Sequence, residues 1–482
     1  MIINLKKIKK APIQVKSSLL FFVGLAIQKV STALSLMLFT RLMQSEQYGH
    51  FSIFNSWLSI WRIVITLCLS AGIYMQGLVK FEDDRKRFES SMQGLSFFLC
   101  MSWLIIYIFF RKYINLFFGF STLQMIMAFG IIWSGSTFDF WSASERVEYR
   151  CKKILVLSLI VALVKPLICY LGIMHSGDKV TGWIFGIVIT ELFFFSGFFV
   201  SAMKNGRVFF DKAYWKYAIA FSIPLIPHYL SQTVLNSADR IMIGKMVGDS
   251  EAGIYNLAYS IAMMLTMLSK AIVSMLNPWI YKKIKVKKVN DIENVGYLSL
   301  CGVAIVNLFL IALAPEIVSI IAPSDYYEAV GIIPPIAISS YFMFSYDLFS
   351  EFAFYYNKTI RIMFASIIGA VLNVLLNLLF IRRWGYFAAA YTTLICFIIY
   401  SVIHYLLMNK ISKQYVQEDA VYDWRKLVVI SVVFMVLGFG YMYSYSNLIV
   451  RLGISLALII LLALKWKKVI AFIKDTMNMH ER

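Results

Sequence analysis

The sequence predicts an all-α polytopic membrane protein of about 14 transmembrane helices, arranged as two six-helix lobes followed by two C-terminal helices. The chain has 482 residues, of which 60% are hydrophobic and 15% are charged. Soluble domains are roughly 45–50% apolar and about 25% charged. Apolar runs long enough to cross a bilayer follow one another along the chain. One pattern also occurs twice, 204 residues apart, which indicates two similar halves.

The repeated pattern lies where one apolar helix is expected to end and the next to begin. Its second copy, NSADRIMIGKMVGDSEAGIYNLAY, covers residues 236–259, and its first copy, TRLMQSEQYGHFSIF, covers residues 40–54. Aligned without gaps, Arg41 corresponds to Lys245 and Ser45 to Asp249. Glycine weakens a helix. We therefore expect helix breaks at the three glycines of the second copy, which are Gly244, Gly248 and Gly253.

A helix needs about 20 mainly apolar residues to cross a bilayer. This criterion predicts fourteen spans, at 17–42, 51–79, 93–111, 115–143, 154–174, 180–203, 215–243, 251–280, 293–314, 328–356, 360–381, 386–408, 427–446 and 448–465. The first span contains Lys29 and ends without a small-residue cleavage site, so we expect it to be retained instead of removed as a signal peptide.

The spans group by the repeat. Spans one to six form an N-terminal lobe, residues 1–204, and spans seven to twelve a C-terminal lobe, residues 205–410. Residues 411–482 hold the last two spans and a tail. In the span 215–243, Pro224 and Pro227 predict a kink, because proline removes a helix hydrogen bond.

The basic residues predict the orientation. If both termini are cytoplasmic, the tails and inner loops hold most of the Lys and Arg, as inner loops of membrane proteins do. The net charge of +20 is thus spread over short loops, and no basic domain exists that would bind nucleic acid. The predicted outer loops hold only Arg41, Arg111, Lys112, Lys179, Arg240, Lys245, Arg382, Arg383 and Arg451.

The loops and the scattered metal-ligand residues argue against an enzyme. All predicted outer loops are short, so none could carry a soluble catalytic domain. The six cysteines and five histidines have no metal-ligand spacing. We therefore expect no catalytic residue, no metal and no cofactor.

Four cations fall within predicted spans: Lys29, Arg62, Lys165 and Lys270. A charge at the bilayer centre costs about 2.5–3.5 kcal/mol on insertion scales, so such side chains usually line a cavity or meet a partner. Subtracting the repeat offset places Lys270 one helical turn after Arg62, so we expect the two to face each other. With Lys29 beside them, they predict a cavity for a multiply charged anion such as a diphosphate. Alternatively, each cation snorkels to an interface or pairs with a carboxylate.

Acidic residues within the spans allow two interpretations. Asp347 and Glu351 are four residues apart on one helix face, so they repel unless one is protonated or a cation binds. They are the candidate coupling pair for H⁺ or Na⁺. Alternatively, these and the other in-span acids balance the cations; the others are Asp139, Glu191 and Glu316. Candidates for stacking on sugar rings are Trp57, Trp61, Tyr341 and Tyr346.

The stretch SADRIMIGKMVGDSEAGIYNLAYSIA resembles the signature region of Wzx-type polysaccharide flippases, in the multidrug/oligosaccharidyl-lipid/polysaccharide (MOP) exporter superfamily. The family pattern is close to D-R-x-x-I-G-x-x-x-G-x-x-x-x-G-x-Y. It is matched by Asp239, Arg240, Ile243, Gly244, Gly248, Gly253 and Tyr255. The first copy, with Arg41, resembles the family's turn between spans one and two. We expect an outer hinge formed by Arg41, Asp239, Arg240, Gly244 and Gly253.

The resemblance implies a MATE-like bundle of two lobes in the bacterial plasma membrane. It implies a flippase that moves an undecaprenyl-diphosphate-linked oligosaccharide outward by alternating access, as a repeat unit of capsule, O-antigen or exopolysaccharide. The diphosphate would bind Lys29, Arg62, Lys270 and Lys165, while the prenyl tail stays among the membrane lipids. Polysaccharide polymerase and glycosyltransferases would be pathway partners. The alternatives are a lipid II flippase and a cation-coupled multidrug exporter of the same fold; the lysines and arginine of the cavity argue against the exporter.

Overall fold

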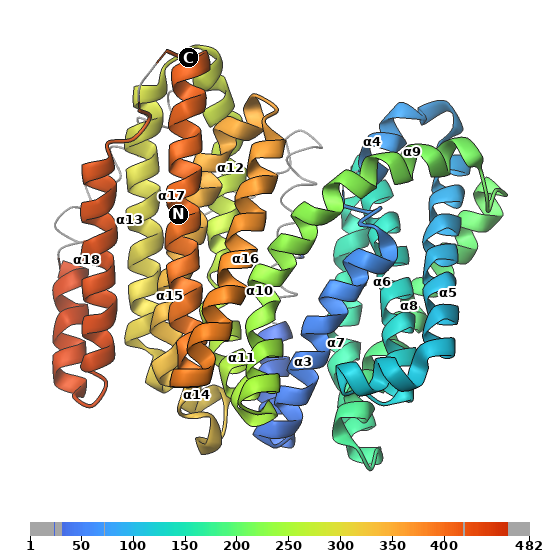
Figure 1. Ribbon diagram of the computed structural model, residues 1–482, viewed down its shortest axis with the longest axis horizontal. Helices are drawn as coiled ribbons and strands as arrows, with labels where there is room; N and C mark the ends of the chain where they lie inside the picture. Colours follow the sequence, from blue (N-terminus) through green and yellow to red (C-terminus); the bar gives the residue numbers. More distant parts are fainter. Residues whose placement is uncertain (1–23, 25–30, 72, 418–419, 461–482) are drawn as a thin grey trace. The chain divides into compact units, whose positions relative to one another are not determined.

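The computed structural model describes residue 24 and residues 31–71, 73–417 and 420–460 (Figure 1). In this part of the chain all regular structure is helical, and ten helices are long and apolar enough to cross a membrane. A shorter apolar helix, Leu448–Ile460, follows them. The chain is therefore a multi-pass membrane protein, and the predicted all-α fold is confirmed. The total of 14 spans stays a prediction, because the first and last spans lie partly outside the described residues.

The helices belong to two compact units, Met1–Ser237 and Ala238–Arg482. The first unit contains α3 Ser45–Thr66, α4 Ile73–Lys80, η1 Glu82–Asp84, α5 Arg85–Phe118, α6 Thr122–Val147, α7 Cys151–His175, α8 Lys179–Gly206, α9 Lys212–Ser222 and η2 Ile223–Leu225. Helix α10, Ile226–Met246, crosses the boundary. The second unit continues with α11 Asp249–Met263, α12 Thr266–Lys285, α13 Val289–Ala312, α14 Ala314–Ile321, η3 Ser324–Tyr326, α15 Ala329–Tyr355, α16 Thr359–Trp384, α17 Phe387–Tyr415 and α18 Trp424–Tyr443.

Helix starts in the two units follow the repeat. Helix α3 begins at Ser45 and α11 at Asp249, 204 residues apart. Helix α5 begins at Arg85 and α13 at Val289, again 204 residues apart. The two units therefore share the register that the sequence repeat predicts. The lobe boundary after residue 204 stays a prediction, since contacts divide the chain elsewhere, within α10.

The predicted helix breaks at Gly244 and Gly253 are wrong. Gly244 lies inside α10 and Gly253 inside α11, and the chain leaves the helical path only at Val247 and Gly248. A glycine within a helix costs only about 1 kcal/mol relative to alanine. Packing of an otherwise apolar helix readily offsets this cost, so the glycines do not end these helices.

The predicted spans 51–79 and 251–280 are each two helices. Helix α3 ends at Thr66 and α4 begins at Ile73, while α11 ends at Met263 and α12 begins at Thr266. At the first break Leu67 and Cys68 have φ angles of 51° and 53°, in the left-handed region that cannot continue a right-handed helix. Interrupted helices occur at membrane depth where protein or a cavity surrounds the backbone.

The predicted break at residues 111–115 is also wrong. Helix α5 continues to Phe118, and the turn comes at Gly119, whose φ of 79° favours glycine. Ser121 then starts α6 with a capping box to Gln124, in which each side chain accepts from the other residue's backbone N–H. The separation of the predicted spans 427–446 and 448–465 is confirmed, as a short turn between α18 and the helix from Leu448.

The kink predicted from Pro224 and Pro227 is confirmed. Helix α9 ends at Ser222, the 3-10 turn η2 contains Pro224, and α10 restarts at Ile226. Figure 1 shows the resulting bend between α9 and α10. Proline at 224 has no N–H to donate, which favours the tighter turn at this point.

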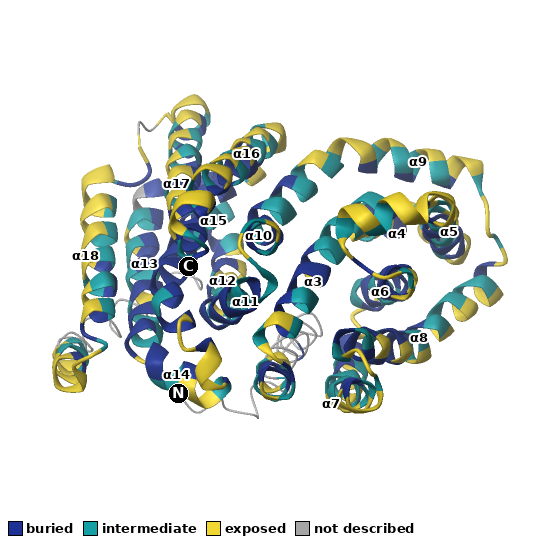
Figure 2. Ribbon diagram, turned by 60° about the horizontal axis from the view of Figure 1, so that its bottom comes forward, coloured by how far each residue is buried: buried dark blue, intermediate teal, exposed yellow. Residues whose placement is uncertain are grey.

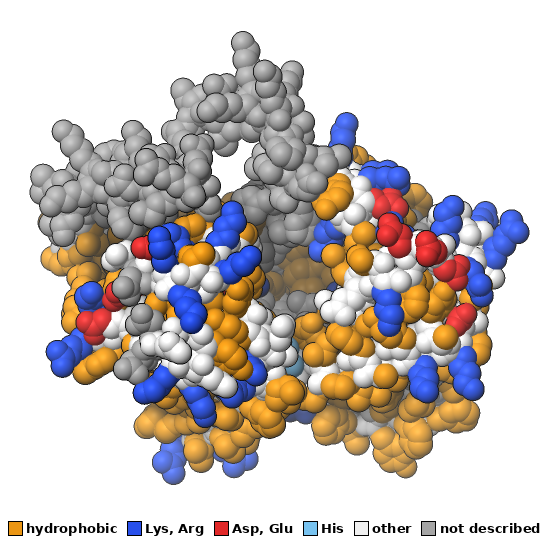
Figure 3. Space-filling view, turned by 90° about the horizontal axis from the view of Figure 1, so that it is seen from above, with side chains coloured by type: hydrophobic (Ala, Val, Ile, Leu, Met, Phe, Trp, Pro, Cys, Tyr) orange, Lys and Arg blue, Asp and Glu red, His pale blue; other side chains and the backbone are white. Residues whose placement is uncertain are grey.

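Helix α15 is the centre of the second unit. It packs against α17, α11, α13 and α12. In its most apolar stretch of 18 residues, 83% of the residues are buried (Figure 2). Helices α7 and α18 are mostly exposed, since only 17% of the residues in the corresponding stretch of each helix are buried. Their outward faces are apolar, as expected for helices that face lipid. In Figure 3, Lys and Arg side chains, with fewer Asp and Glu, lie on the described surface of each unit.

In the first unit α8 packs against α7, α6 and α5. Helices α7 and α8 come close together at two glycines: a Cβ built on Gly172 would lie 2.2 Å from the carbonyl oxygen of Gly182. Small residues allow membrane helices to pack backbone against backbone. This crossing fixes the position of two side chains that face a cavity, one from each helix.

Candidate functional site

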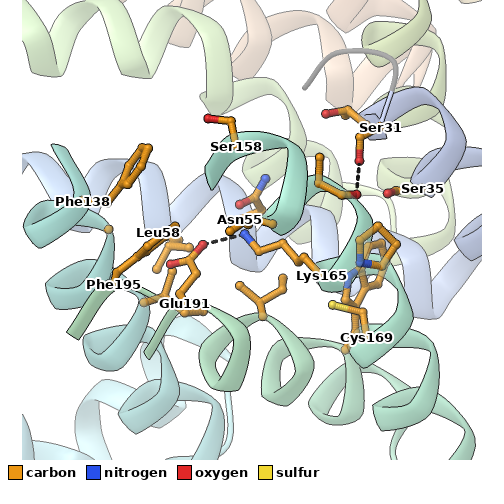
Figure 4. A pocket seen from close by; sticks show the side chains of 18 of the residues that line it. Ser31, Ser35, Asn55, Leu58, Phe138, Ser158, Lys165, Cys169, Glu191 and Phe195 are labelled. Atoms are coloured by element: carbon orange, nitrogen blue, oxygen red, sulfur yellow. Dashed lines mark hydrogen bonds and ion pairs between the residues drawn. The ribbon is translucent and has the colours of Figure 1, made fainter. Parts of the chain in front are cut away.

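A cavity of about 610 Å³ lies within the first unit, among helical residues 31–42 and helices α3, α6, α7 and α8 (Figure 4). Its polar side chains include Ser31, Thr32, Ser35, Asn55, Ser59 and Ser158. Its aromatic rings are Phe39, Phe51, Phe138, Trp183 and Phe195. Hydroxyl and amide groups in such number inside an apolar bundle suit a polar ligand better than a hydrocarbon.

Arg62 of α3 lines this cavity beside Asp139 of α6. The guanidinium Nη2 lies 2.5 Å from the carboxylate Oδ2, and the two side chains are 44% and 38% exposed. Ser70 also donates to Asp139, at 3.4 Å. Gly135 makes room for the guanidinium, since a Cβ there would stand 3.3 Å from Nη2. The ion pair therefore faces open space, in which Arg62 can still donate to a ligand.

Lys165 of α7 lines the same cavity beside Glu191 of α8 (Figure 4). Its Nζ lies 2.6 Å from Oε1 of Glu191, and Ser134 of α6 donates to the other carboxylate oxygen at 3.3 Å. The lysine is 32% exposed and the glutamate 12%. Lys165 thus presents a cation to the cavity from the side held by the α7–α8 crossing.

The structure brings together two of the four predicted cations and supplies their partners. Arg62 and Lys165 line one cavity, and each is paired with a carboxylate, the arrangement that the sequence left as an alternative. Lys29 lies outside the described residues. Lys270 belongs to the second unit, so its predicted position opposite Arg62 stays a prediction.

In the second unit Lys270 is exposed on α12 and interacts electrostatically with Asp347 of α15. Glu351, one turn further along α15, is buried beside Tyr281 and Asn277. Asp347 thus has a cation near it, which weakens its repulsion of Glu351. Their role as an H⁺ or Na⁺ coupling pair stays a prediction. The remaining in-span acid, Glu316 of α14, pairs with the buried Arg451.

The motif residue Asp239 lies inside the second unit, fully buried. Its carboxylate accepts hydrogen bonds from Tyr255 of α11 at 2.7 Å, Asn377 of α16 at 2.6 Å and Thr393 of α17 at 2.8 Å. The neighbouring Arg240 lies over the ring of Tyr259, 4.2 Å from its centroid. Asp239 therefore joins α10 to three other helices.

Three partners of this cluster escaped the sequence interpretation: Asn373, Asn377 and Thr393. Both asparagines are fully buried in α16, and Asn377 donates to Asn373 at 3.4 Å. The signal was present, because two asparagines four residues apart in an apolar span share one helix face and polar groups there seek partners. Arg41 lies at the end of helical residues 31–42. Hinge motion at the motif residues stays a prediction.

The predicted sugar-stacking rings do not line the cavity. Trp57 and Trp61 stack on each other, with centroids 6.1 Å apart. Tyr341 is buried and contacts Ser431 at 3.1 Å through its hydroxyl group. At the cavity wall Phe51 stacks on Trp183 at 3.6 Å, with 11° between the planes. Among the described residues no group of three or more His, Cys, Asp or Glu side chains is placed to hold a metal ion.

Comparison with protein families places the chain. A family model described as polysaccharide biosynthesis protein matches residues 14–284, more than half of the sequence. The chain belongs to the polysaccharide biosynthesis protein family. The resemblance inferred from the Asp239–Tyr255 motif, to polysaccharide flippases of the MOP superfamily, is confirmed. A second family model, MatE, matches residues 224–379 of this family member.

One curated relative of this polysaccharide biosynthesis family member is distantly similar. Lsg locus putative protein 1 of Haemophilus influenzae (strain ATCC 51907 / DSM 11121 / KW20 / Rd) is 23% identical over 207 residues, 42% of this chain. The match covers 52% of that protein, so the chain spans about half the length of the curated relative it matches.

Two solved structures have the same fold. The lipid II flippase MurJ in an inward closed conformation has a TM-score of 0.71 at 14% identity, covering 94% of this chain and 100% of that one. An inward-facing multidrug resistance MATE family transporter of the MOP superfamily has a TM-score of 0.62 at 12% identity, covering 81% of this chain and 98% of that one. These likenesses confirm the predicted MATE-like fold and, at such identity, extend no further.

Proposed function

We propose that this polysaccharide biosynthesis family member is a flippase, not an enzyme. It moves an undecaprenyl-diphosphate-linked oligosaccharide across the bacterial plasma membrane by alternating access, with both termini cytoplasmic. The oligosaccharide is a repeat unit of capsule, O-antigen or exopolysaccharide. The observation that carries the proposal is the cavity of the first unit, where Arg62 and Lys165 face hydroxyl and amide groups within an apolar bundle.

The cavity suits each part of such a substrate. Serine, threonine and asparagine side chains bond sugar hydroxyls, and aromatic rings such as Phe138 and Phe195 pack on sugar faces. Arginine binds phosphate oxygens in a bidentate manner, and a diphosphate carries more negative charge than a single carboxylate, so it competes well for Arg62. Asp139 and Glu191 neutralise the two cations, which would otherwise be costly at membrane depth.

The rest of the cycle follows from the same chemistry. Lys270 and Lys29 would add to the cation set that holds the diphosphate, while the prenyl tail remains in the surrounding lipid. Proton or Na⁺ binding at Asp347 and Glu351 would couple transport to an ion gradient. Glycosyltransferases would supply the lipid-linked substrate, and polysaccharide polymerase would consume it.

The proposal is tested by separating ligand binding from charge balance at Arg62. We compare Arg62→Gln, Asp139→Asn and the double variant, and measure surface polysaccharide at equal protein abundance in cells that lack the wild-type gene. If Arg62 binds the diphosphate, Arg62→Gln and the double variant both lose about tenfold or more of the output, since charged hydrogen bonds contribute roughly 1.5–3 kcal/mol.

The double variant decides between the two roles. If Arg62 only neutralises Asp139, removing both charges restores output, and that result would contradict the proposal. Lys165→Gln with Glu191→Gln gives the same comparison on the opposite wall. The matched control is Lys86→Gln, which removes an exposed cation from α5 outside the cavity.

A second candidate is a cation-coupled multidrug exporter of the same fold. It is favoured by the carboxylates Asp139 and Glu191, which face the cavity and would attract cationic drugs. Cells that overproduce the wild-type chain would then resist cationic dyes, and Asp139→Asn would abolish the resistance. A further experiment expresses this chain in cells depleted of their lipid II flippase. Growth of these cells would identify lipid II, and not another lipid-linked glycan, as a substrate.

A further inference from the structure

A second hollow, of about 390 Å³, lies on the first unit between α6, α7 and α8. Among the described residues that line the two hollows, only Leu157 belongs to both. Its lining is Trp141, Lys152, Lys153, Val156, Leu157, Ile160 and Phe198. No step of the proposed transport uses this groove.

The long side of the groove is apolar and faces outward. On α7, Val156 and Ile160 are 47% and 42% exposed, and α7 is among the least buried of the described membrane helices. Trp141 of α6 and Phe198 of α8 stack at 4.2 Å with 7° between their planes. This flat aromatic pair beside exposed branched side chains forms a surface on which a hydrocarbon chain can lie.

One end of the groove is basic. Lys152 and Lys153 lie in the first turn of α7. Among the described residues Lys152 makes no ion pair, and Lys153 contacts Glu145 at 3.0 Å while remaining 56% exposed. Nearby Arg150 pairs with Glu148 at 2.6 Å. This end therefore retains positive charge and free ammonium donors after its acids are counted.

The length of the groove matches one bilayer leaflet. From Lys152 to Ile160 the helix rises about 12 Å, at about 1.5 Å per residue. Half of a hydrocarbon core of about 30 Å is about 15 Å. A lipid with its headgroup at the lysines would therefore lie with an acyl chain along Val156 and Ile160, inside a single leaflet.

We propose that this groove binds an anionic phospholipid of the surrounding bilayer. The headgroup phosphate accepts hydrogen bonds from Lys152 and Lys153, and an acyl chain packs on Trp141 and Phe198. Basic clusters at the membrane edge of helix bundles select anionic over zwitterionic lipids. A phospholipid fits better than the flipped substrate, because the groove opens outward and is almost separate from the polar cavity.

The test uses the purified full chain in nanodiscs of equal phosphatidylglycerol and phosphatidylcholine, with brominated acyl chains on one lipid at a time. Bromine quenches tryptophan on contact, and the difference between wild type and Trp141→Phe isolates the signal of Trp141. We expect brominated phosphatidylglycerol to quench this signal about twofold or more above brominated phosphatidylcholine. Equal quenching by the two lipids in the wild-type chain would overturn the proposal.

Two variants locate the selectivity. Lys152→Gln with Lys153→Gln should make the two lipids quench equally, whereas Lys86→Gln with Lys204→Gln, two exposed lysines outside the groove, should leave the preference intact. Selectivity that persists in the first pair would refute the assignment. Native mass spectrometry of retained phosphatidylglycerol, with and without the lysine pair, gives an independent measurement if Trp141→Phe disturbs the aromatic stack.

Discussion

At the scale of single residues, the buried carboxylate of Asp239 explains why a sequence motif coincides with a structural junction. A buried charge is tolerated only where hydrogen bonds satisfy it. Asp239 receives three, from Tyr255, Asn377 and Thr393, each on a different helix. The motif therefore encodes the joining of α10 to α11, α16 and α17.

Replacing Asp239 should destabilise the second unit. In Asp239→Ala three buried donors lose their acceptor, at about 1–3 kcal/mol for each that stays unsatisfied. We expect a clearly lower midpoint of thermal unfolding for the purified protein in detergent. Asp239→Asn keeps the shape of the side chain and one acceptor oxygen, so its unfolding midpoint should fall by less than that of Asp239→Ala.

The control for this series is Asp83→Asn, which changes an exposed carboxylate of η1. It should melt with the wild type. An Asp239→Ala protein that also melts with the wild type would mean that the cluster contributes nothing to stability, contrary to our interpretation.

At the scale of helices, the crossing of α7 and α8 positions the cavity. Gly172 and Gly182 bring the two backbones together, and Lys165 and Glu191 extend from the same two helices into the cavity. Because lipid is as apolar as leucine, membrane helices associate through close packing of small residues and through interhelical hydrogen bonds. A substitution that separates α7 from α8 should therefore also disturb the ion pair between Lys165 and Glu191.

Gly172→Leu should separate the two helices, because even a Cβ at this position meets backbone atoms of Gly182. We expect a loss of about 1–3 kcal/mol from overpacking, measured as a lower unfolding midpoint, together with reduced polysaccharide output. Gly197→Leu is the matched control, since nothing lies within 4 Å of a Cβ at that position of α8. Equal behaviour of the two variants would show that the crossing is not tight.

The positions of the helix interruptions could not be predicted from the hydropathy of the sequence. The apolar run 51–79 contains no proline, yet Leu67 and Cys68 adopt positive φ and divide it into α3 and α4. Conversely, Gly244 and Gly253 lie within continuous helices. Hydropathy reports length and burial, whereas the exact break depends on which backbone groups neighbouring helices can satisfy.

At the scale of the whole molecule, charge predicts the orientation. In a cysteine-free background we expect Gly177→Cys and Asp325→Cys to react with a membrane-impermeant maleimide in spheroplasts. Lys86→Cys and Lys287→Cys should react only after lysis, because Lys- and Arg-rich loops stay in the cytoplasm. Labelling of Lys287→Cys in sealed spheroplasts would reverse the assigned orientation.

The sequence by itself determined the membrane class, most spans, the 204-residue register and the family motif. Each rests on a local property: the length of an apolar run, the spacing of a turn, or a short pattern around Asp239. These survive in any arrangement of the helices, which is why Ser45 and Asp249 could be aligned before any fold was known.

Only the tertiary structure shows which of the charged residues form ion pairs. Arg62 finds Asp139 77 residues away, and Lys165 finds Glu191 26 residues away. The sequence contains these cations and acids, but it does not show which of them pair or that two pairs line one cavity. Pairing between helices depends on their rotation and crossing, which packing at contacts such as Gly172 and Gly182 fixes and which no local pattern encodes.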